Sequence, residues 1–259
     1  MSIKVVILCG GFGTRLKEET EFRPKPMIEI GGMPILWHIM KTYAYYGFNE
    51  FILCLGYKAD LIKQYFYNYE MLANDFTIEL GTKNITVHSN HSEKGWKIFL
   101  INTGLSAMTG ARVKRIEKYI DTDTFMLTYG DGLTNVNLKS VLDFHLNHGK
   151  IGTITGVHPP SKYGELTIYQ DQVLSFNEKQ EKQNNSINGG YFVLNRKFFS
   201  FLRDDDSCIL EKEPLENLAA AGELKVFHHQ GFWQCMDTNR DYKYLCDIWE
   251  GGKAPWKVW

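Results

Sequence analysis

Hydrophobic and polar residues follow two different patterns along the first 150 positions. The apolar run at 3–8, and similar runs at 51–55 and 124–129, are typical of central strands buried on both faces of a sheet. Apolar side chains recur at helical spacing from Pro34 until Gly47, and again over 59–67 and 138–147. Because strands and helices alternate, this half predicts βαβ units around a largely parallel sheet.

The pattern changes after about residue 150. Shorter strands are predicted at 152–157, 165–168, 173–176 and 191–194, with an exposed loop tip at 180–186 and closing helices at 213–221 and 240–250. We therefore predict one α/β domain over 1–259, with a Rossmann-like, mostly parallel central sheet flanked by helices. Its first half, about 1–150, would bind the main ligand at the carboxyl ends of the strands, and about 151–259 would add a smaller β-rich lobe.

Composition narrows the class of protein. Apolar residues make up 44% and charged residues 23%, as expected of a globular chain. The net charge of -1 predicts no nucleic-acid partner, and no apolar run approaches the length of a membrane span, so we expect a cytoplasmic protein without a membrane partner. Five scattered cysteines without a C-x-x-C pair suggest neither a disulfide framework nor a zinc site.

A glycine-rich loop follows the first predicted strand. Gly10, Gly11 and Gly13 leave the backbone free to approach a phosphate and to offer it amide donors. The dinucleotide fingerprint is broken because Leu16 stands where its third glycine should be, and the Walker loop is absent. The glycines alone are equally compatible with a tight strand-to-helix turn that binds nothing.

Two basic residues favour the phosphate interpretation. Arg15 closes the loop with a guanidinium group that suits phosphate oxygens. Lys25 lies between Pro24 and Pro26, which restrict the backbone around it and favour one position for its ammonium group. A lysine between prolines is otherwise an ordinary exposed turn.

Two aspartates are candidate ligands for Mg²⁺. Asp131 follows the strand at 124–129 between two glycines, and Asp237 follows a second apolar run. Mg²⁺ binds one or two carboxylates together with phosphate oxygens and water, so the pair suits it. In the alternative, Asp131 makes an Asx turn and Asp237 caps the helix that begins near Arg240.

The motif G-G-x-G-T-R-L, followed by P-K-P, resembles the signature of the sugar-1-phosphate nucleotidylyltransferases. The resemblance implies that the loop wraps a nucleoside triphosphate, that Arg15, Lys25 and Asp131 serve catalysis, and that Asp131 and Asp237 bind Mg²⁺. No protein nucleophile is required, because an ionised sugar phosphate can attack the α-phosphorus directly. The nucleotide-binding residues implied in this part of the chain are Leu8, Cys9, Gly10, Gly11, Phe12, Gly13, Thr14, Arg15, Lys25 and Gly130.

The second half resembles the sugar-binding stretches of the same family. The residues that this resemblance assigns to the sugar are Tyr163, Gly164, Glu178, Lys179, Asn188 and Gly189. The smaller β-rich lobe is accordingly expected to bind the sugar. Gln180 departs from the family pattern, in which proline often follows the lysine, and an adjacent Glu-Lys is in general more often a surface pair.

Stretches at 34–40, 102–104, 108–112 and 252–257 resemble the members of this family that use CTP and glucose 1-phosphate to make CDP-glucose. This resemblance also implies a homo-oligomer, with a hexamer among the candidates. Thr103, Thr109, Gly110 and Ala111 are candidates for lining the base-binding part of the site, although a threonine there could instead cap a helix running to Tyr119. The same chemistry with UTP or dTTP, and a relative that binds nucleotide without turnover, remain alternatives.

Overall fold

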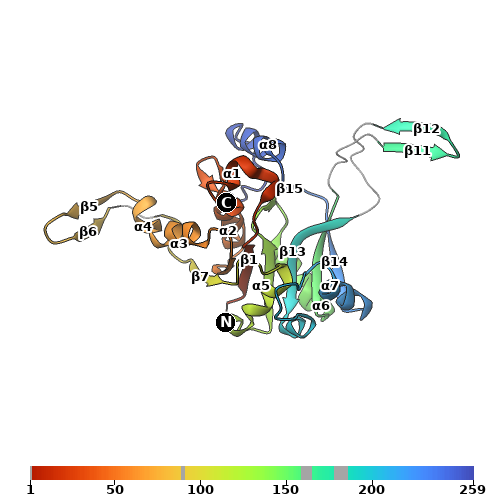
Figure 1. Cartoon of the computed structure of the whole chain (residues 1–259), viewed down its shortest axis with the longest axis horizontal. Helices are drawn as coiled ribbons and strands as arrows, with labels where there is room; N and C mark the ends of the chain where they lie inside the picture. Colours follow the sequence, from red (N-terminus) through yellow and green to blue (C-terminus); the bar gives the residue numbers. More distant parts are fainter. Residues whose placement is uncertain (1, 89–90, 159–164, 178–185) are drawn as a thin grey trace.

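The computed structural model describes residues 2–88, 91–158, 165–177 and 186–259. Its centre is a seven-stranded sheet in the order β14-β10-β13-β8-β1-β4-β7 (Figure 1). These strands are β14 (Leu224–His229), β10 (Gly152–Val157), β13 (Ile187–Asn195), β8 (Thr124–Tyr129), β1 (Lys4–Cys9), β4 (Glu50–Leu55) and β7 (Lys97–Asn102). β13 pairs antiparallel with both β8 and β10, whereas the other pairs in this sheet are parallel.

Helices cover both faces of the sheet. Along β1, Val5 and Ile7 point into one core and Val6 and Leu8 into the other, because successive side chains of a strand alternate between faces. The first core is covered by α2 (Ile35–Tyr45), α6 (Leu138–His148) and α8 (Asn239–Glu250), and the second by α5 (Thr109–Arg115) and α7 (Glu213–Ala220). The predicted Rossmann-like architecture is confirmed.

The strands predicted in the second half largely complete the central sheet. β10 and β13 were expected in a separate lobe, but both lie in the main sheet, since the run 189–194 is buried and needs cover on both faces. The edge strands β7 and β14 were not predicted. β14 reads Leu-Lys-Val-Phe-His-His and is half exposed, as is common for edge strands, so it carries no continuous apolar signal.

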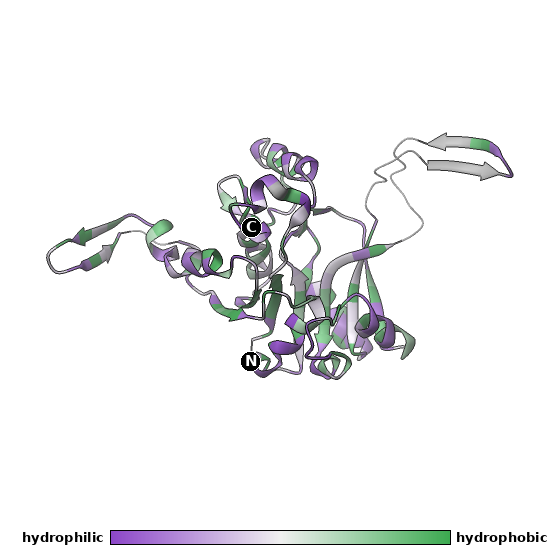
Figure 2. Cartoon of the chain, in the orientation of Figure 1, coloured by the Kyte–Doolittle hydropathy of each residue, from purple (hydrophilic) through white to green (hydrophobic). Residues whose placement is uncertain are grey.

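Two hairpins project from opposite sides of this body (Figure 1). One joins β11 (Glu165–Tyr169) to β12 (Gln172–Asn177), and the other joins β5 (Phe76–Glu79) to β6 (Asn84–Val87). The second hairpin follows α3 (Ala59–Tyr67) and α4 (Tyr69–Leu72) and carries apolar side chains at exposed positions (Figure 2). Of the strands that the sequence assigned to a smaller lobe, only β11 and β12 lie outside the main sheet.

Short elements complete the chain between the main strands and helices. They are η1 (Thr14–Leu16), α1 (Lys17–Thr20), η2 (Lys25–Met27), β2 (Glu29–Ile30), β3 (Met33–Pro34), η3 (Glu117–Tyr119), β9 (Gly132–Thr134), η4 (Arg196–Phe201) and β15 (Trp233–Cys235). The C-terminal tail packs on the body, where Trp256 is fully buried beside His38 and Trp249. Across the described ranges, no helix combines the length and apolarity that crossing a bilayer demands.

The chain order of the strands reverses direction at β1. β1 pairs with β4 on one side and with β8 on the other, so the connections that leave these strands diverge. The crevice formed at such a point, outside the carboxyl ends of the strands, is where open α/β sheets bind ligands. The segments after Cys9 and Tyr129 meet there.

Candidate active site

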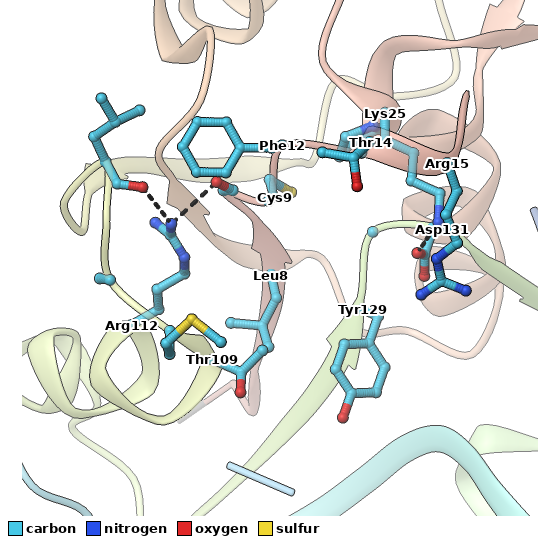
Figure 3. Close-up of a pocket in the computed structure, with 18 of the residues that line it drawn as sticks. Leu8, Cys9, Phe12, Thr14, Arg15, Lys25, Thr109, Arg112, Tyr129 and Asp131 are labelled. Carbon is cyan, nitrogen blue, oxygen red and sulfur yellow. Dashed lines mark hydrogen bonds and ion pairs between the residues drawn. The ribbon is translucent and has the colours of Figure 1, made fainter. Parts of the chain in front are cut away.

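A cavity of about 420 Å³ lies at the carboxyl ends of β1 and β8 (Figure 3). Its walls come from the glycine loop, the turn after Lys25, the start of α5 with the residues before it, the end of β8, and Asp237. The lining residues are Leu8, Cys9, Gly10, Gly11, Phe12, Gly13, Thr14, Arg15, Lys25, Pro26, Leu105, Ser106, Ala107, Met108, Thr109, Arg112, Tyr129, Gly130, Asp131 and Asp237. Most of the residues predicted to bind nucleotide are therefore brought together.

The glycines of the loop are needed for different physical reasons. Gly13 has φ of +65°, a conformation that a side chain disfavours. A Cβ on Gly10 would collide with the guanidinium of Arg112. Gly11 has no atom within 4 Å of the position a Cβ would take, so its missing side chain leaves open space beside the loop.

Lys25 lies at one end of the cavity between two carboxylates. It opens the short turn η2, which Pro24 precedes, and its side chain is only 13% exposed. Its Nζ lies 2.5 Å from Asp131 Oδ2 and 2.7 Å from Asp237 Oδ1. Burial alone would lower the pKa of Lys25, but the two carboxylates outweigh it and raise the pKa to about 12.

Asp237 links the two basic residues singled out by the sequence. Its second oxygen, Oδ2, lies 3.0 Å from Arg15 Nη1, and the Arg15 side chain is 74% exposed at the rim. Burial would raise the pKa of Asp237, but Lys25 and Arg15 together lower it. Thr238, in a capping box with Asp241, caps α8, so the alternative in which Asp237 caps this helix is wrong.

The acidic residues form a donor set that a divalent cation can use. Oxygens of Asp131 and Asp237 and the Cys235 sulfur lie within 4.8 Å of one another. Mg²⁺ prefers carboxylate oxygens over a thiol, so the aspartate pair fits it. The Lys25 ammonium lies between these carboxylates, and a metal ion would bind them in exchange for that ammonium.

Three of the residues predicted to contact the base lie behind the cavity wall. Thr103 is buried, and its hydroxyl accepts a hydrogen bond of 2.9 Å from Arg112 Nη1. Gly110 packs against Cys208, whose sulfur a Cβ at position 110 would meet at 2.6 Å, and Ala111 is fully buried. In this structure these residues support the wall by packing, and they do not face the cavity.

Thr109 does line the cavity, but it caps no helix. Met108 occupies the N-cap position of α5. The Thr109 hydroxyl donates to Glu211 Oε2 at 2.6 Å and accepts from the Leu210 amide at 2.9 Å. The capping alternative for Thr109 is therefore wrong, because its hydroxyl is engaged by the segment that precedes α7.

The predicted sugar-binding residues fall into two groups. Asn188 and Gly189 begin β13 outside the cavity lining, where Asn188 Oδ1 accepts from the Gly190 amide at 2.7 Å and the Gly189 carbonyl accepts from Trp233 Nε1 at 2.6 Å. The remaining residues lie outside the described part of the chain, namely Tyr163, Gly164, Glu178 and Lys179.

The comparison with known proteins agrees with this geometry. A family model described as nucleotidyl transferase matches residues 4–238. The chain belongs to the nucleotidyl transferase family.

Individual relatives of this nucleotidyl transferase chain match along almost its full length. It is 50% identical to glucose-1-phosphate cytidylyltransferase of Salmonella typhi, over 99% of this chain and all of that protein. It is 45% identical to a probable glucose-1-phosphate cytidylyltransferase of Bacillus subtilis, with the same coverage. Among solved structures, HddC from Yersinia pseudotuberculosis superposes with a TM-score of 0.68 at 26% identity, covering 95% of this chain and 99% of that one.

Sequence reasoning missed Arg112, which holds the glycine loop of this nucleotidyl transferase from behind. Its guanidinium is buried and donates to the carbonyls of Gly10, Leu55, Gly104 and Leu105 as well as to Thr103. The sequence did offer a signal for Arg112, because the residues around it on the predicted helix are small or apolar. Such a position is buried, and a buried cation needs several acceptors.

Proposed function

We propose that this nucleotidyl transferase converts CTP and glucose 1-phosphate to CDP-glucose and pyrophosphate. The observation that carries the proposal is the convergence of Lys25, Arg15, Asp131 and Asp237 beside one glycine loop. Simple binding of a nucleotide does not require two cations and two carboxylates around one phosphate. The choice of CTP and of glucose 1-phosphate rests on the full-length relatives at 45% and 50% identity.

The reaction is an in-line displacement at the α-phosphorus. A phosphate oxygen of the sugar phosphate attacks, the bond from the α-phosphorus to the bridging oxygen breaks, and pyrophosphate leaves with the electron pair. The backbone amides of the loop at 10–14 bind the triphosphate, while Lys25 and Arg15 stabilise the charge that develops around the α-phosphate. The two anionic substrates repel each other, so neutralising them and aligning them is the main work of the protein.

We assign Mg²⁺ to Asp131 and Asp237. When bound there, it would neutralise phosphate charge and orient the triphosphate. Lys25 balances the charge of both aspartates in this structure, and its ammonium is the group that would neutralise a phosphate oxygen of the bound triphosphate.

For the sugar we assign Asn188 and Gly189 at the start of β13, together with Tyr163, Gly164, Glu178 and Lys179. The support is their resemblance to the sugar-binding stretches of the family. In addition, β13 begins at the edge of the sheet on which the cavity opens, because it runs against β8.

The test is pyrophosphate release from CTP, UTP, dTTP and GTP with glucose 1-phosphate and Mg²⁺, with and without a chelator. We expect release with CTP that depends on both the sugar phosphate and the metal ion. A preference for UTP or dTTP would reassign the base while keeping the chemistry, and no release with any triphosphate would favour a nucleotide-binding relative without turnover.

We also propose that the protein is a cytoplasmic homo-oligomer, with a hexamer as the form to test. The projecting β5–β6 hairpin exposes apolar side chains that another subunit could cover. Leu80 is 84% exposed and Leu72, at the base of the hairpin, is 69% exposed. Sedimentation of the wild-type protein should give a multiple of the 30.0 kDa chain mass, and a Leu80→Asp variant should shift toward smaller species.

A further inference from the structure

Glu211 connects two walls of the cavity although it does not line the cavity itself. Its Oε1 accepts a hydrogen bond from the Tyr129 hydroxyl at the end of β8, and its Oε2 accepts from the Thr109 hydroxyl at the start of α5, at 2.6 Å. Both hydroxyl-bearing residues line the cavity. Figure 3 shows Thr109 and Arg112 on the side of the pocket opposite Lys25 and Asp131, with Tyr129 between them.

The hydrogen bonds to Glu211 fix where each hydroxyl proton points. A carboxylate only accepts hydrogen bonds, and a hydroxyl has one proton to donate and two lone pairs. Thr109 gives its proton to Glu211 and uses one lone pair for the Leu210 amide, which leaves one lone pair and no proton for a ligand. The Tyr129 hydroxyl likewise gives its proton to the other oxygen of Glu211, since this carboxylate can only accept.

Toward a ligand, these two hydroxyls therefore present acceptors only. A triphosphate held at the Lys25 end would extend its nucleoside toward the opposite end of the cavity, where Thr109 lies (Figure 3). Leu105 and Met108 also line the cavity. The pyrimidine edge that distinguishes the bases carries an amino donor in cytosine and a carbonyl acceptor in uracil and thymine. An acceptor on this wall can accept a hydrogen bond from the amino group of cytosine. The same acceptor cannot form a hydrogen bond with the carbonyl of uracil or thymine, because neither group has a proton to donate.

We propose that Glu211 is a specificity-determining residue, which orients the Thr109 hydroxyl as an acceptor and so favours cytosine over uracil. This inference rests on the proposed nucleotidyl transfer from CTP and names the group that selects the base. Glu211 acts through Thr109 and need not touch the nucleotide. Its effect should appear in the ratio of kcat/KM for CTP to that for UTP.

The test is the substitution Glu211→Gln, which keeps the shape of the side chain and replaces one carboxylate oxygen with an amide NH2 donor. The amide can then donate to one hydroxyl, which turns the proton of that hydroxyl toward other acceptors. We expect the CTP/UTP ratio to fall about tenfold or more, the usual effect of leaving one polar group unpaired. Thr109→Val removes the acceptor itself and should lower the same ratio, and the double variant should fall no further than the single ones, because both act on one hydroxyl.

The control is Glu216→Gln, the same substitution on an exposed position of α7, which should keep the wild-type ratio and melting temperature. A ratio that stays within about twofold of wild type in folded Glu211→Gln overturns the inference; should that variant not fold, an unchanged ratio in Thr109→Val does so. Wild-type protein that uses UTP as well as CTP also contradicts the inference while leaving nucleotidyl transfer intact. Wild-type protein that releases no pyrophosphate from any triphosphate overturns the proposed function itself.

Discussion

Two cationic side chains flank the glycine loop, and they are bonded in opposite ways. Lys25 is paired with the carboxylates of Asp131 and Asp237 at the open end of the cavity. Arg112 lies behind the loop, where every hydrogen bond described for it goes to a backbone carbonyl or to Thr103. The pKa of Lys25 is raised to about 12, whereas burial lowers the pKa of Arg112.

The difference separates the proposed catalytic cation, Lys25, from a cation that supports the fold, Arg112. The carboxylates that hold Lys25 are the proposed metal ligands, and Lys25 is the cation proposed to serve the phosphate. The carbonyls that hold Arg112 belong to the loop, to the last residue of β4 and to the chain after β7, and releasing them would leave a buried cation without its acceptors. Substitutions on the two sides should therefore affect different quantities.

The largest expected effect is on turnover in Lys25→Ala. Loss of a preorganised cation beside the reacting phosphate should lower kcat at least about a hundredfold. Circular dichroism should show an unchanged fold, since the hydrogen bonds described for the Lys25 side chain go to two carboxylates and not to the backbone. Arg23→Ala removes a nearby cation that pairs with Glu19 and Glu29 and should keep near wild-type kcat; wild-type turnover in Lys25→Ala would contradict the assigned role.

Arg112→Met should instead reduce stability. It removes the five hydrogen bonds made by a buried guanidinium group, so we expect the free energy of unfolding to fall by about 3 kcal/mol or more in urea titrations. Arg203→Met, which removes exposed ion pairs with Asp205 and Glu213, should cost less than about 1 kcal/mol. Equal losses in the two variants would remove the distinction drawn between the two cations.

Asp237→Asn should weaken the binding of metal. With one carboxylate lost, the Mg²⁺ concentration that gives half-maximal turnover should rise about tenfold, because Mg²⁺ relies on few protein carboxylates. A chelator should abolish turnover in both proteins. The matched control is Asp247→Asn, on the exposed side of α8, and a shift of the Mg²⁺ dependence in that variant as well would make the effect nonspecific.

The smallest expected effect is the pH dependence of stability that Asp237 provides. Because the pKa of its carboxyl is lowered in the folded protein, its ion pairs stabilise the fold above the ordinary carboxyl pKa of 3.8 and lose this contribution as the pH falls further. The contribution is partly exposed to solvent, so we expect less than about 1 kcal/mol. The difference in unfolding free energy between wild type and Asp237→Asn should shrink between pH 5 and pH 3; a difference that grows in this range would show that the sign is wrong.

The sequence predicted the reactive end of the cavity well and the opposite end poorly. Lys25 could be found because two prolines flank it, and Asp131 because it follows the end of an apolar strand. Thr103, Gly110 and Ala111 were assigned to the cavity, yet they lie behind its wall. Sequence spacing shows that a helix has a buried face, but it does not show whether that face meets a ligand or another segment of chain.

The same limit applies to Glu211 and Arg112, which act on the cavity across long stretches of sequence. Glu211 bonds to Tyr129 and Thr109, each more than 80 positions away. Such contacts depend on how α5 and the segment before α7 pack together, and no local pattern encodes them. For the fold, the central strands were predicted because burial on both faces gives a continuous apolar run, and the half-exposed edge strand β14 gives none.

The reversed strand β13 has an evolutionary consequence. β10 ends at the rim of the sheet that opens on the cavity, and β13 starts from that same rim, because the two strands run in opposite directions. The connection between them therefore leaves and rejoins the body at that one edge of the sheet, whatever its length. Insertions and deletions in this connection can alter that edge of the molecule without altering the pairing of any strand in the main sheet.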